Sequence, residues 1–157
     1  MSGVVVIGVG NRYRRDDGAG PAVLDALATD VVARAVRLVE LDGEPARLVD
    51  AWAGVDLAIV VDALRSDRTA PGTVRRVDVG DDVGVLGDSS GAAAGSHALG
   101  IGTAAALGRA LGRMPTRLIV FGVEGADFGH GEELSQPVRR AVTDVAERIA
   151  AEIAGIG

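Results

Sequence analysis

Three short apolar runs, each followed by glycine or aspartate, most constrain how this chain of 157 residues folds. They read VVVI at residues 4–7, LAIVV at 57–61 and LIVF at 118–121. Runs of this length and β-branched content are typical of strands buried on both faces, which occur in parallel sheets covered by helices. We therefore expect strands of this kind to form the centre of the fold.

Helical patterns fill the intervals between these runs. Apolar residues recur at three- and four-residue steps after Pro21 and over residues 138–153, with Ser135 as the cap of the last helix. The other expected elements are a strand at 36–41, a short helix at 46–52 and an edge strand at 73–79. The alternation predicts one domain over residues 1–157, a three-layer α/β/α sandwich with a mostly parallel sheet of about five strands.

A further helix is expected to begin at Ser96, after a loop at residues 80–95 that is rich in Gly, Asp, Ser and Ala. We expect this loop to be mobile. The buried stripe of the helix is predicted from residues spaced three or four apart, which are Leu99, Thr103, Ala106 and Ala110, with Leu107 and Leu111 beside it.

Composition excludes several classes of protein. A net charge of -6 and a pI near 4.8 argue against a nucleic-acid partner. The chain has no cysteine, which excludes disulfides, thiolate metal sites and a cysteine nucleophile. No apolar run approaches the roughly 20 residues that a membrane span needs. We expect a cytoplasmic protein with no membrane or nucleic-acid partner.

Polar residues stand where the predicted strands and helices should meet at one edge of the sheet. Asp16 and Asp17 lie in the loop after the first strand, Asp62 follows the second apolar run, and His97 opens a helix. Ligands of open parallel sheets bind at this edge, and a helix N-terminus favours the neutral imidazole that binds metals. Two carboxylates and an imidazole would suit a nickel or zinc ion.

Other readings of these residues stay open. The glycines of the first loop suit a tight turn with solvated charges, Asp62 can cap a turn, and a lone histidine is often structural. His130 is expected at the surface. A nucleotide site is excluded, because Tyr13 occupies the third-glycine position of a dinucleotide fingerprint and the chain has no Gly-Lys-Ser or Gly-Lys-Thr sequence.

An ordered set of motifs resembles the hydrogenase maturation endopeptidase family, the proteases that trim the C-terminal extension of the nickel-iron hydrogenase large subunit. The motifs span nearly the whole chain and read GVGN at 8–11, DDG at 16–18, VDA at 61–63, APGT at 70–73, SHALG at 96–100, FGVE at 121–124 and DFG at 127–129. The resemblance implies an α/β sandwich with endopeptidase activity, whose partner is a hydrogenase large-subunit precursor.

The resemblance also implies which residues form the site. Asp17, Asp62 and His97 would recognise a divalent metal, which is nickel supplied by the substrate, and no organic cofactor is expected. We expect Asp17 and His97 at the rim of a cleft. Because no serine stands in a nucleophile elbow, attack by water is favoured, with Asp17 or Asp62 as base.

Two segments depart from the family pattern. Arg12, Arg14 and Arg15 follow GVGN where the family usually has apolar residues, and they would pair with aspartates or meet an acidic patch on a partner. The family often reads Asp-Gly-Gly-Thr where this chain reads DGEP at 42–45, so Asp42 and Gly43 are the candidate substrate-handling residues. The departures leave two alternatives: a nickel-checking chaperone that does not cleave, and a hydrolase or phosphorylase of small molecules.

Overall fold

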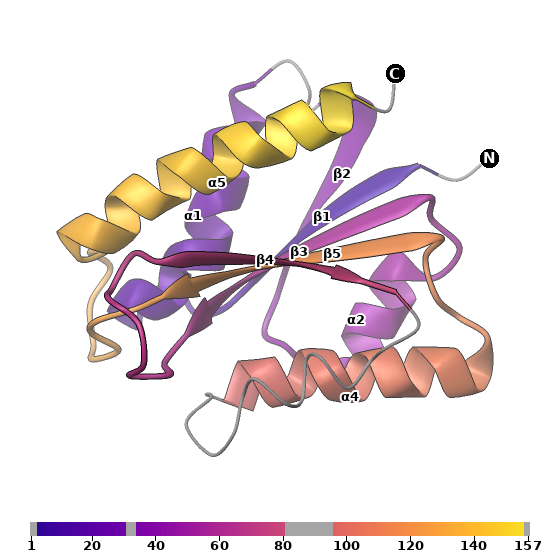
Figure 1. The fold of residues 1–157 in the computed structure, drawn as a ribbon, viewed down its shortest axis with the longest axis horizontal. Coiled ribbons are helices and arrows are strands. Elements are labelled where there is room, and N and C mark those ends of the chain that lie inside the picture. Colours follow the sequence, from indigo (N-terminus) through magenta and orange to yellow (C-terminus); the bar gives the residue numbers. More distant parts are fainter. Residues whose placement is uncertain (1–2, 31–33, 81–95, 156–157) are drawn as a thin grey trace.

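A central sheet with helices on both faces forms the fold (Figure 1). The computed structural model describes residues 3–30, 34–80 and 96–155, and within the last range it describes side chains from residue 100 onward. The loop expected at residues 80–95 lies, apart from Gly80, outside the described residues.

The sheet has five strands in the order β2-β1-β3-β5-β4. Their bounds are β1 (Val4–Val9), β2 (Val36–Leu41), β3 (Leu57–Leu64), β4 (Val74–Val79) and β5 (Arg117–Glu124). Neighbouring strands are parallel except at one edge, where β4 runs antiparallel to β5. The predicted mostly parallel sheet is therefore confirmed, and so is the edge position of the strand expected at residues 73–79.

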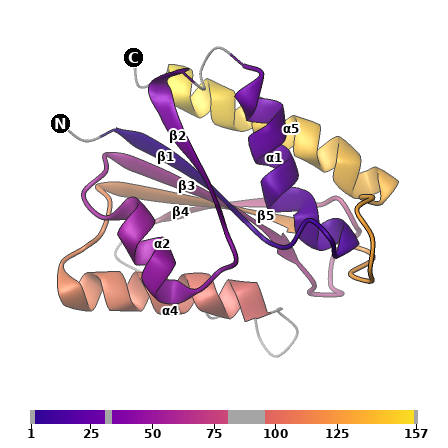
Figure 2. The ribbon, with the colours of Figure 1, turned by 180° about the vertical axis from the view of Figure 1, so that it is seen from behind.

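Helices of the described residues cover both faces of the sheet (Figure 2). One face carries α1 (Ala19–Ala28) and α5 (Gln136–Ala154), and the other carries α2 (Pro45–Trp52) and α4 (Ser96–Leu111). A short 3₁₀ helix, η1 (Arg15–Gly18), precedes α1. The predicted three-layer α/β/α sandwich is confirmed. No helix within the described residues combines the length and the apolar character that crossing a membrane requires.

Side chains of the central strands alternate between two separate cores. In β3, Ile59 and Val61 join the core under α1 and α5, whereas Ala58 and Val60 join the core under α2 and α4. This alternation follows from the two-residue period of a strand. It also assigns Asp62, the next residue in the Ala58 and Val60 series, to the face that α2 and α4 cover.

The buried stripe predicted for α4 is wrong. Ile101, Ala104 and Ala105 are buried, whereas Thr103, Ala106 and Ala110 are exposed, and the side chain of Leu99 lies outside the described residues. The backbone of the helix comes close to that of Gly43, because a Cβ on Gly100 would lie 2.5 Å from the Gly43 carbonyl oxygen. Such close backbone approach selects for small size, which a hydrophobic periodicity does not detect.

The predicted ends of the central strands are also wrong. Asp62 was expected to end its strand, but β3 continues to Leu64, and Asp62 pairs in register with Gly122 of β5. The two strands extend together past the apolar runs because each continued residue has a ladder partner on the neighbouring strand. Asp62 is therefore held by regular sheet structure and does not lie in a loop.

Gly20 sets how closely α1 approaches the sheet. A Cβ at this position would lie 2.6 Å from the carbonyl oxygens of Val9 and Val61. No real Cβ tolerates such contacts with backbone atoms, so the helix would have to move away from β1 and β3. The same contact holds η1, which leads directly into α1, beside the ends of both strands.

We expect Gly20→Ala to lower the free energy of unfolding by about 2–3 kcal/mol, because the added methyl group overpacks a rigid contact. Urea denaturation followed by circular dichroism measures the change. Gly3→Ala is the control, since a Cβ there meets nothing within 4 Å, and it should change stability by less than about 0.5 kcal/mol. Equal stabilities of the two variants would contradict the role assigned to Gly20.

Candidate functional site

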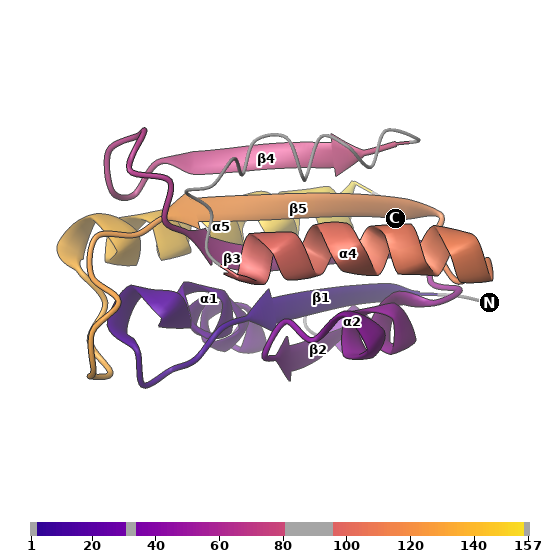
Figure 3. The ribbon, with the colours of Figure 1, turned by 90° about the horizontal axis from the view of Figure 1, so that it is seen from below.

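The candidate site lies at the edge of the sheet to which the parallel strands point. Figure 3 shows the arrowheads of β1 and β5, the η1 segment and the beginning of α4 on this side of the molecule. Parallel strands in the described sheet bring their carboxyl ends together here, as expected from the sequence.

Asp16 is fully buried and accepts four hydrogen bonds. Its Oδ2 accepts from the backbone N–H groups of Ala126 and Asp127 at 2.7 and 3.0 Å and from Ser135 Oγ at 2.8 Å. Its Oδ1 accepts from the Ser135 N–H at 2.7 Å. Asp16 therefore ties the loop after β1 to the loop after β5. Ser135 occupies the N-cap position of α5, as predicted, but its hydroxyl binds Asp16 and makes no cap hydrogen bond to the helix.

Asp17 is buried, with 5% of its surface exposed, so the expectation that it lies at a rim is wrong. Its Oδ2 accepts a hydrogen bond of 2.9 Å from the N–H of Asn11. The backbone of Asp17 leaves no room for a side chain at position 10, because a Cβ on Gly10 would lie 1.9 Å from the Asp17 carbonyl oxygen. Gly10 also has a φ of +145°, which favours glycine. The GVGN motif thus holds Asp17 against the end of β1.

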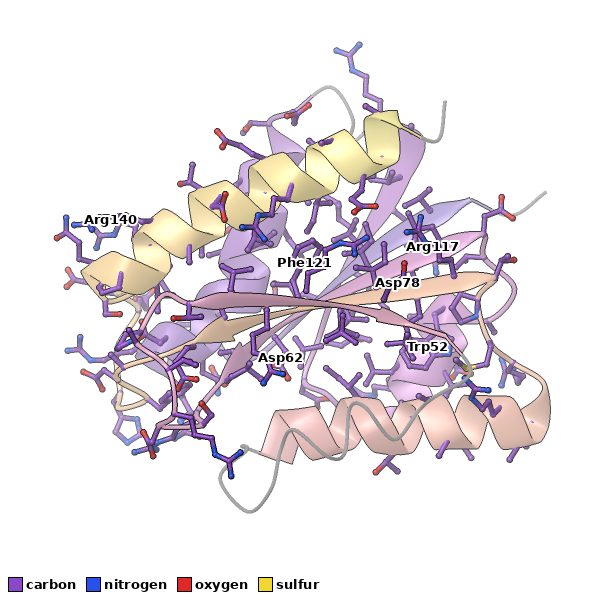
Figure 4. All side chains as sticks on the ribbon, viewed as in Figure 1. Trp52, Asp62, Asp78, Arg117, Phe121 and Arg140 are labelled. Carbon is purple, nitrogen blue, oxygen red and sulfur yellow. The ribbon has the colours of Figure 1, made fainter. Side chains whose placement is uncertain are left out.

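Asp62 is 1% exposed and lies inside β3. Figure 4 shows its side chain on the α4 side of the sheet, in agreement with the strand alternation. Segment η1, which carries Asp17, contacts the same strand. The structure therefore brings the two predicted carboxylates to one edge of the sheet, both away from bulk water.

His97 is the second residue of α4, and its side chain lies outside the described residues. The helix backbone begins at the same edge, because Gly100 in its first turns lies against Gly43. Among the described residues, no three His, Asp or Glu side chains are grouped closely enough to hold a metal ion. Asp17 and Asp62 could supply carboxylate ligands, so a complete metal site needs donors from the His97 side chain or from a substrate.

The segment that departs from the family pattern forms a helix start. Asp42 is exposed and its Oδ1 accepts from the Glu44 N–H at 3.0 Å, while Gly43 is buried with a φ of +97°. The Glu44 carboxylate accepts from the N–H groups of Ala46 and Arg47 at 3.2 and 3.1 Å. Glu44 therefore caps α2, and Pro45 occupies the first helical position, where its missing N–H costs nothing.

Arg12 does not pair with the aspartates of its own loop. It forms ion pairs with Asp25 of α1 at 2.7 Å and with Glu40 of β2 at 2.8 Å. The hydrogen bonds that Arg12 donates to Asp25 hold the pKa of the Asp25 carboxyl below its usual range, and the accepting carboxylates of Asp25 and Glu40 raise the pKa of Arg12. This cluster attaches the loop after β1 to both neighbouring elements.

Glu124 is a buried carboxylate to which the sequence reasoning assigned no role. It is 2% exposed and accepts hydrogen bonds from the Ser66 N–H at 3.0 Å, from the Ser66 hydroxyl and from the Thr69 hydroxyl at 3.0 Å. It thereby fixes the loop that follows β3. Its place at the end of the FGVE motif is the only signal in the sequence, and the motif does not reveal which loop it holds.

The chain is similar to hydrogenase maturation proteases. The family model of hydrogenase maturation protease (HycI) matches residues 21–152. Hydrogenase maturating endopeptidase HybD from Escherichia coli is 24% identical, with a TM-score of 0.80 over 100% of this chain and 94% of its own. The NiFe hydrogenase maturation protease HybD from Thermococcus kodakarensis is 25% identical, with a TM-score of 0.73 over 98% and 99%. No curated protein sequence matches significantly.

We expect Asp16→Asn to lower the free energy of unfolding by about 3 kcal/mol, because an amide NH₂ group would face buried N–H donors. Chemical denaturation measures this loss. Glu133→Gln, an exposed change in the loop after β5, is the control and should leave stability within about 0.5 kcal/mol of wild type. A tolerated Asp16→Asn would show that the four hydrogen bonds do not hold the loops together.

The Arg12 ion pair predicts a small dependence of stability on pH. The lowered pKa of Asp25 adds stability above its unfolded pKa of about 3.9, and this stability is lost as the pH falls through the lower folded pKa. Asp25→Asn should therefore flatten the acid side of the stability curve, by less than about 1 kcal/mol because the Asp25 side chain is 62% exposed. Arg12→Gln should flatten it at least as much in the same titration; an unchanged curve would contradict the assignment.

Proposed function

The chain belongs to the hydrogenase maturation protease family, and we propose that this peptidase removes the C-terminal extension of a nickel-loaded nickel-iron hydrogenase large-subunit precursor in the cytoplasm. The observation that carries the proposal is the family match over residues 21–152. The burial of two carboxylates at the carboxyl edge of the sheet supports it further. The nickel is part of the substrate and no organic cofactor takes part.

Asp17, Asp62 and His97 are the residues we propose to recognise the nickel. Burying a carboxylate costs free energy unless hydrogen bonds or a cation compensate its charge. Asp17 and Asp62 are both at least 95% buried, at 5% and 1% exposed, so a cation that reaches them gains strong electrostatic attraction. The neutral imidazole expected at the start of α4 would supply the softer donor that nickel prefers over calcium.

Water is the proposed nucleophile, since the chain contains no cysteine. The carboxylate of Asp17 or Asp62 accepts one proton from the water as its oxygen attacks the scissile carbonyl. The same proton is then given to the departing amine, so that one water is consumed and a new carboxylate and a new amino terminus are formed. Both carboxylates lie close to strand ends, at the edge where ligands of open parallel sheets bind.

Incubation with the nickel-loaded large-subunit precursor tests the proposal. Intact-mass spectrometry should show the precursor losing the mass of its C-terminal extension. Asp17→Asn, Asp62→Asn and His97→Ala should each slow the loss by at least about 100-fold, because each removes a metal-recognising or proton-accepting group. Glu147→Gln, an exposed change on α5, should cleave at the wild-type rate. Normal cleavage by all three site variants would overturn the assignment of these residues.

A chaperone that checks the nickel without cleaving is the second candidate. The cap formed by Glu44 favours it, because this segment replaces the Asp-Gly-Gly-Thr that the family resemblance connects with substrate handling. The same incubation separates the two functions. A stable complex with the precursor and no loss of mass would support the chaperone and exclude the protease.

A further inference from the structure

Three arginines contact the loop that follows β5. Arg15 lies with its Nε 3.4 Å from Asp127 Oδ2, and its backbone N–H donates to the carbonyl oxygen of Gly131 at 2.8 Å. Arg14 donates from its guanidinium to the Phe128 carbonyl oxygen at 3.0 Å. The guanidinium carbon of Arg65, on the loop after β3, lies 5.4 Å from the centre of the Phe128 ring. Two of these cations, Arg14 and Arg65, therefore meet at one phenylalanine.

Arg14 and Arg65 differ from Arg12 and Arg15 in their electrostatic partners. Arg12 and Arg15 pair with carboxylates, whereas no ion pair joins Arg14 or Arg65 to a carboxylate within the described part of the chain. Both side chains belong to exposed residues. The two guanidinium groups are therefore exposed positive charges without a paired carboxylate among the described residues, in a protein with a net charge of -6.

Aromatic side chains complete this region. Tyr13 is 65% exposed and its carbonyl oxygen accepts from the Gly131 N–H at 3.0 Å, which holds it next to the same loop. Phe128 is half-buried. We define Tyr13, Arg14, Arg65 and Phe128 as the Phe128 surface. Tyrosine and arginine are the residue types that most often dominate binding energy at protein interfaces.

The Phe128 surface borders the candidate site. A Cβ on Gly125 would lie 2.5 Å from the Phe128 ring and 3.1 Å from the Asp16 Cβ, so the ring packs close to the buried carboxylate that fixes η1. Arg65 follows β3 directly, three residues after Asp62. A polypeptide that reaches Asp17 and Asp62 would therefore pass close to this surface.

We propose that the Phe128 surface binds one or two carboxylates of an acidic segment of the large-subunit precursor and so contributes to substrate choice. The inference rests on the proposed function. The hydrogen bond to the Phe128 carbonyl and the stacking of Arg65 hold both guanidinium groups in place, which lowers the entropy cost of binding. Exposed Glu132 and Glu133 on the same loop disfavour a long acidic stretch and favour a short one.

The test compares wild type with the double variant Arg14→Glu/Arg65→Glu. Arg34→Glu/Arg140→Glu is the matched control, because it changes the net charge equally at two exposed arginines outside the surface; Figure 4 labels Arg140 on α5. The Arg14→Glu/Arg65→Glu variant should have a KM and a binding Kd for the nickel-loaded precursor about tenfold higher than wild type at low salt. Its kcat should be unchanged. Added salt should weaken binding to wild type more than to the double variant.

Other outcomes overturn the inference. A KM and Kd equal to those of the control double variant would show that the surface does not contact the precursor. A lower kcat with an unchanged KM would show that the arginines only support the loops.

Arg14→Gln/Arg65→Gln, which keeps polar side chains, should show a smaller increase of KM and Kd. Thermal melting should confirm that all variants fold. If wild type binds but never cleaves the precursor, the proposed protease function fails while the Kd comparison still tests the surface.

Discussion

The buried carboxylate of Asp16 is the interaction on which the arrangement of the site depends. A charge without solvent requires several donors, and here they come from the loop after β5 and from the start of α5. The loop after β5, at residues 125–134, contains no helix, and the loop after β1 contains only the short 3₁₀ helix η1. By joining them, Asp16 fixes η1, and η1 in turn holds Asp17 beside β3. Asp16 thus makes possible the position of Asp17, which is its neighbour in the chain and a proposed metal ligand.

The central strands and the layers could be predicted because their signal is local. β-branched runs buried on both faces can form little else, and their order along the chain implies parallel pairing. The contacting face of α4 could not be predicted, since the buried Ala104 and Ala105 have the same side chain as the exposed Ala106 and Ala110. What selects that face is the backbone contact between Gly100 and Gly43, which depends on the position of another element.

The candidate site, too, could be predicted only in part from the sequence. The edge at which Asp17 and Asp62 lie follows from the rule for parallel sheets, and the sequence is enough to apply it. The roles of Asp16 and Glu124 are not in the sequence, because their hydrogen-bond partners lie up to 119 and 58 positions away. Likewise, only the folded chain shows that Arg12 binds Asp25 and Glu40. Arg14, two residues later, instead binds the carbonyl oxygen of Phe128.

The two cores on opposite faces of the sheet have a consequence for how this protein can change. Their side chains pack in separate clusters, although the same strands contribute to both. Substitutions at distant, independent positions usually have additive effects on stability. Substitutions in the core beneath α2 and α4 can therefore accumulate while the core beneath α1 and α5 stays constant. The helices on the two faces can change nearly independently of each other around one unchanged set of strands.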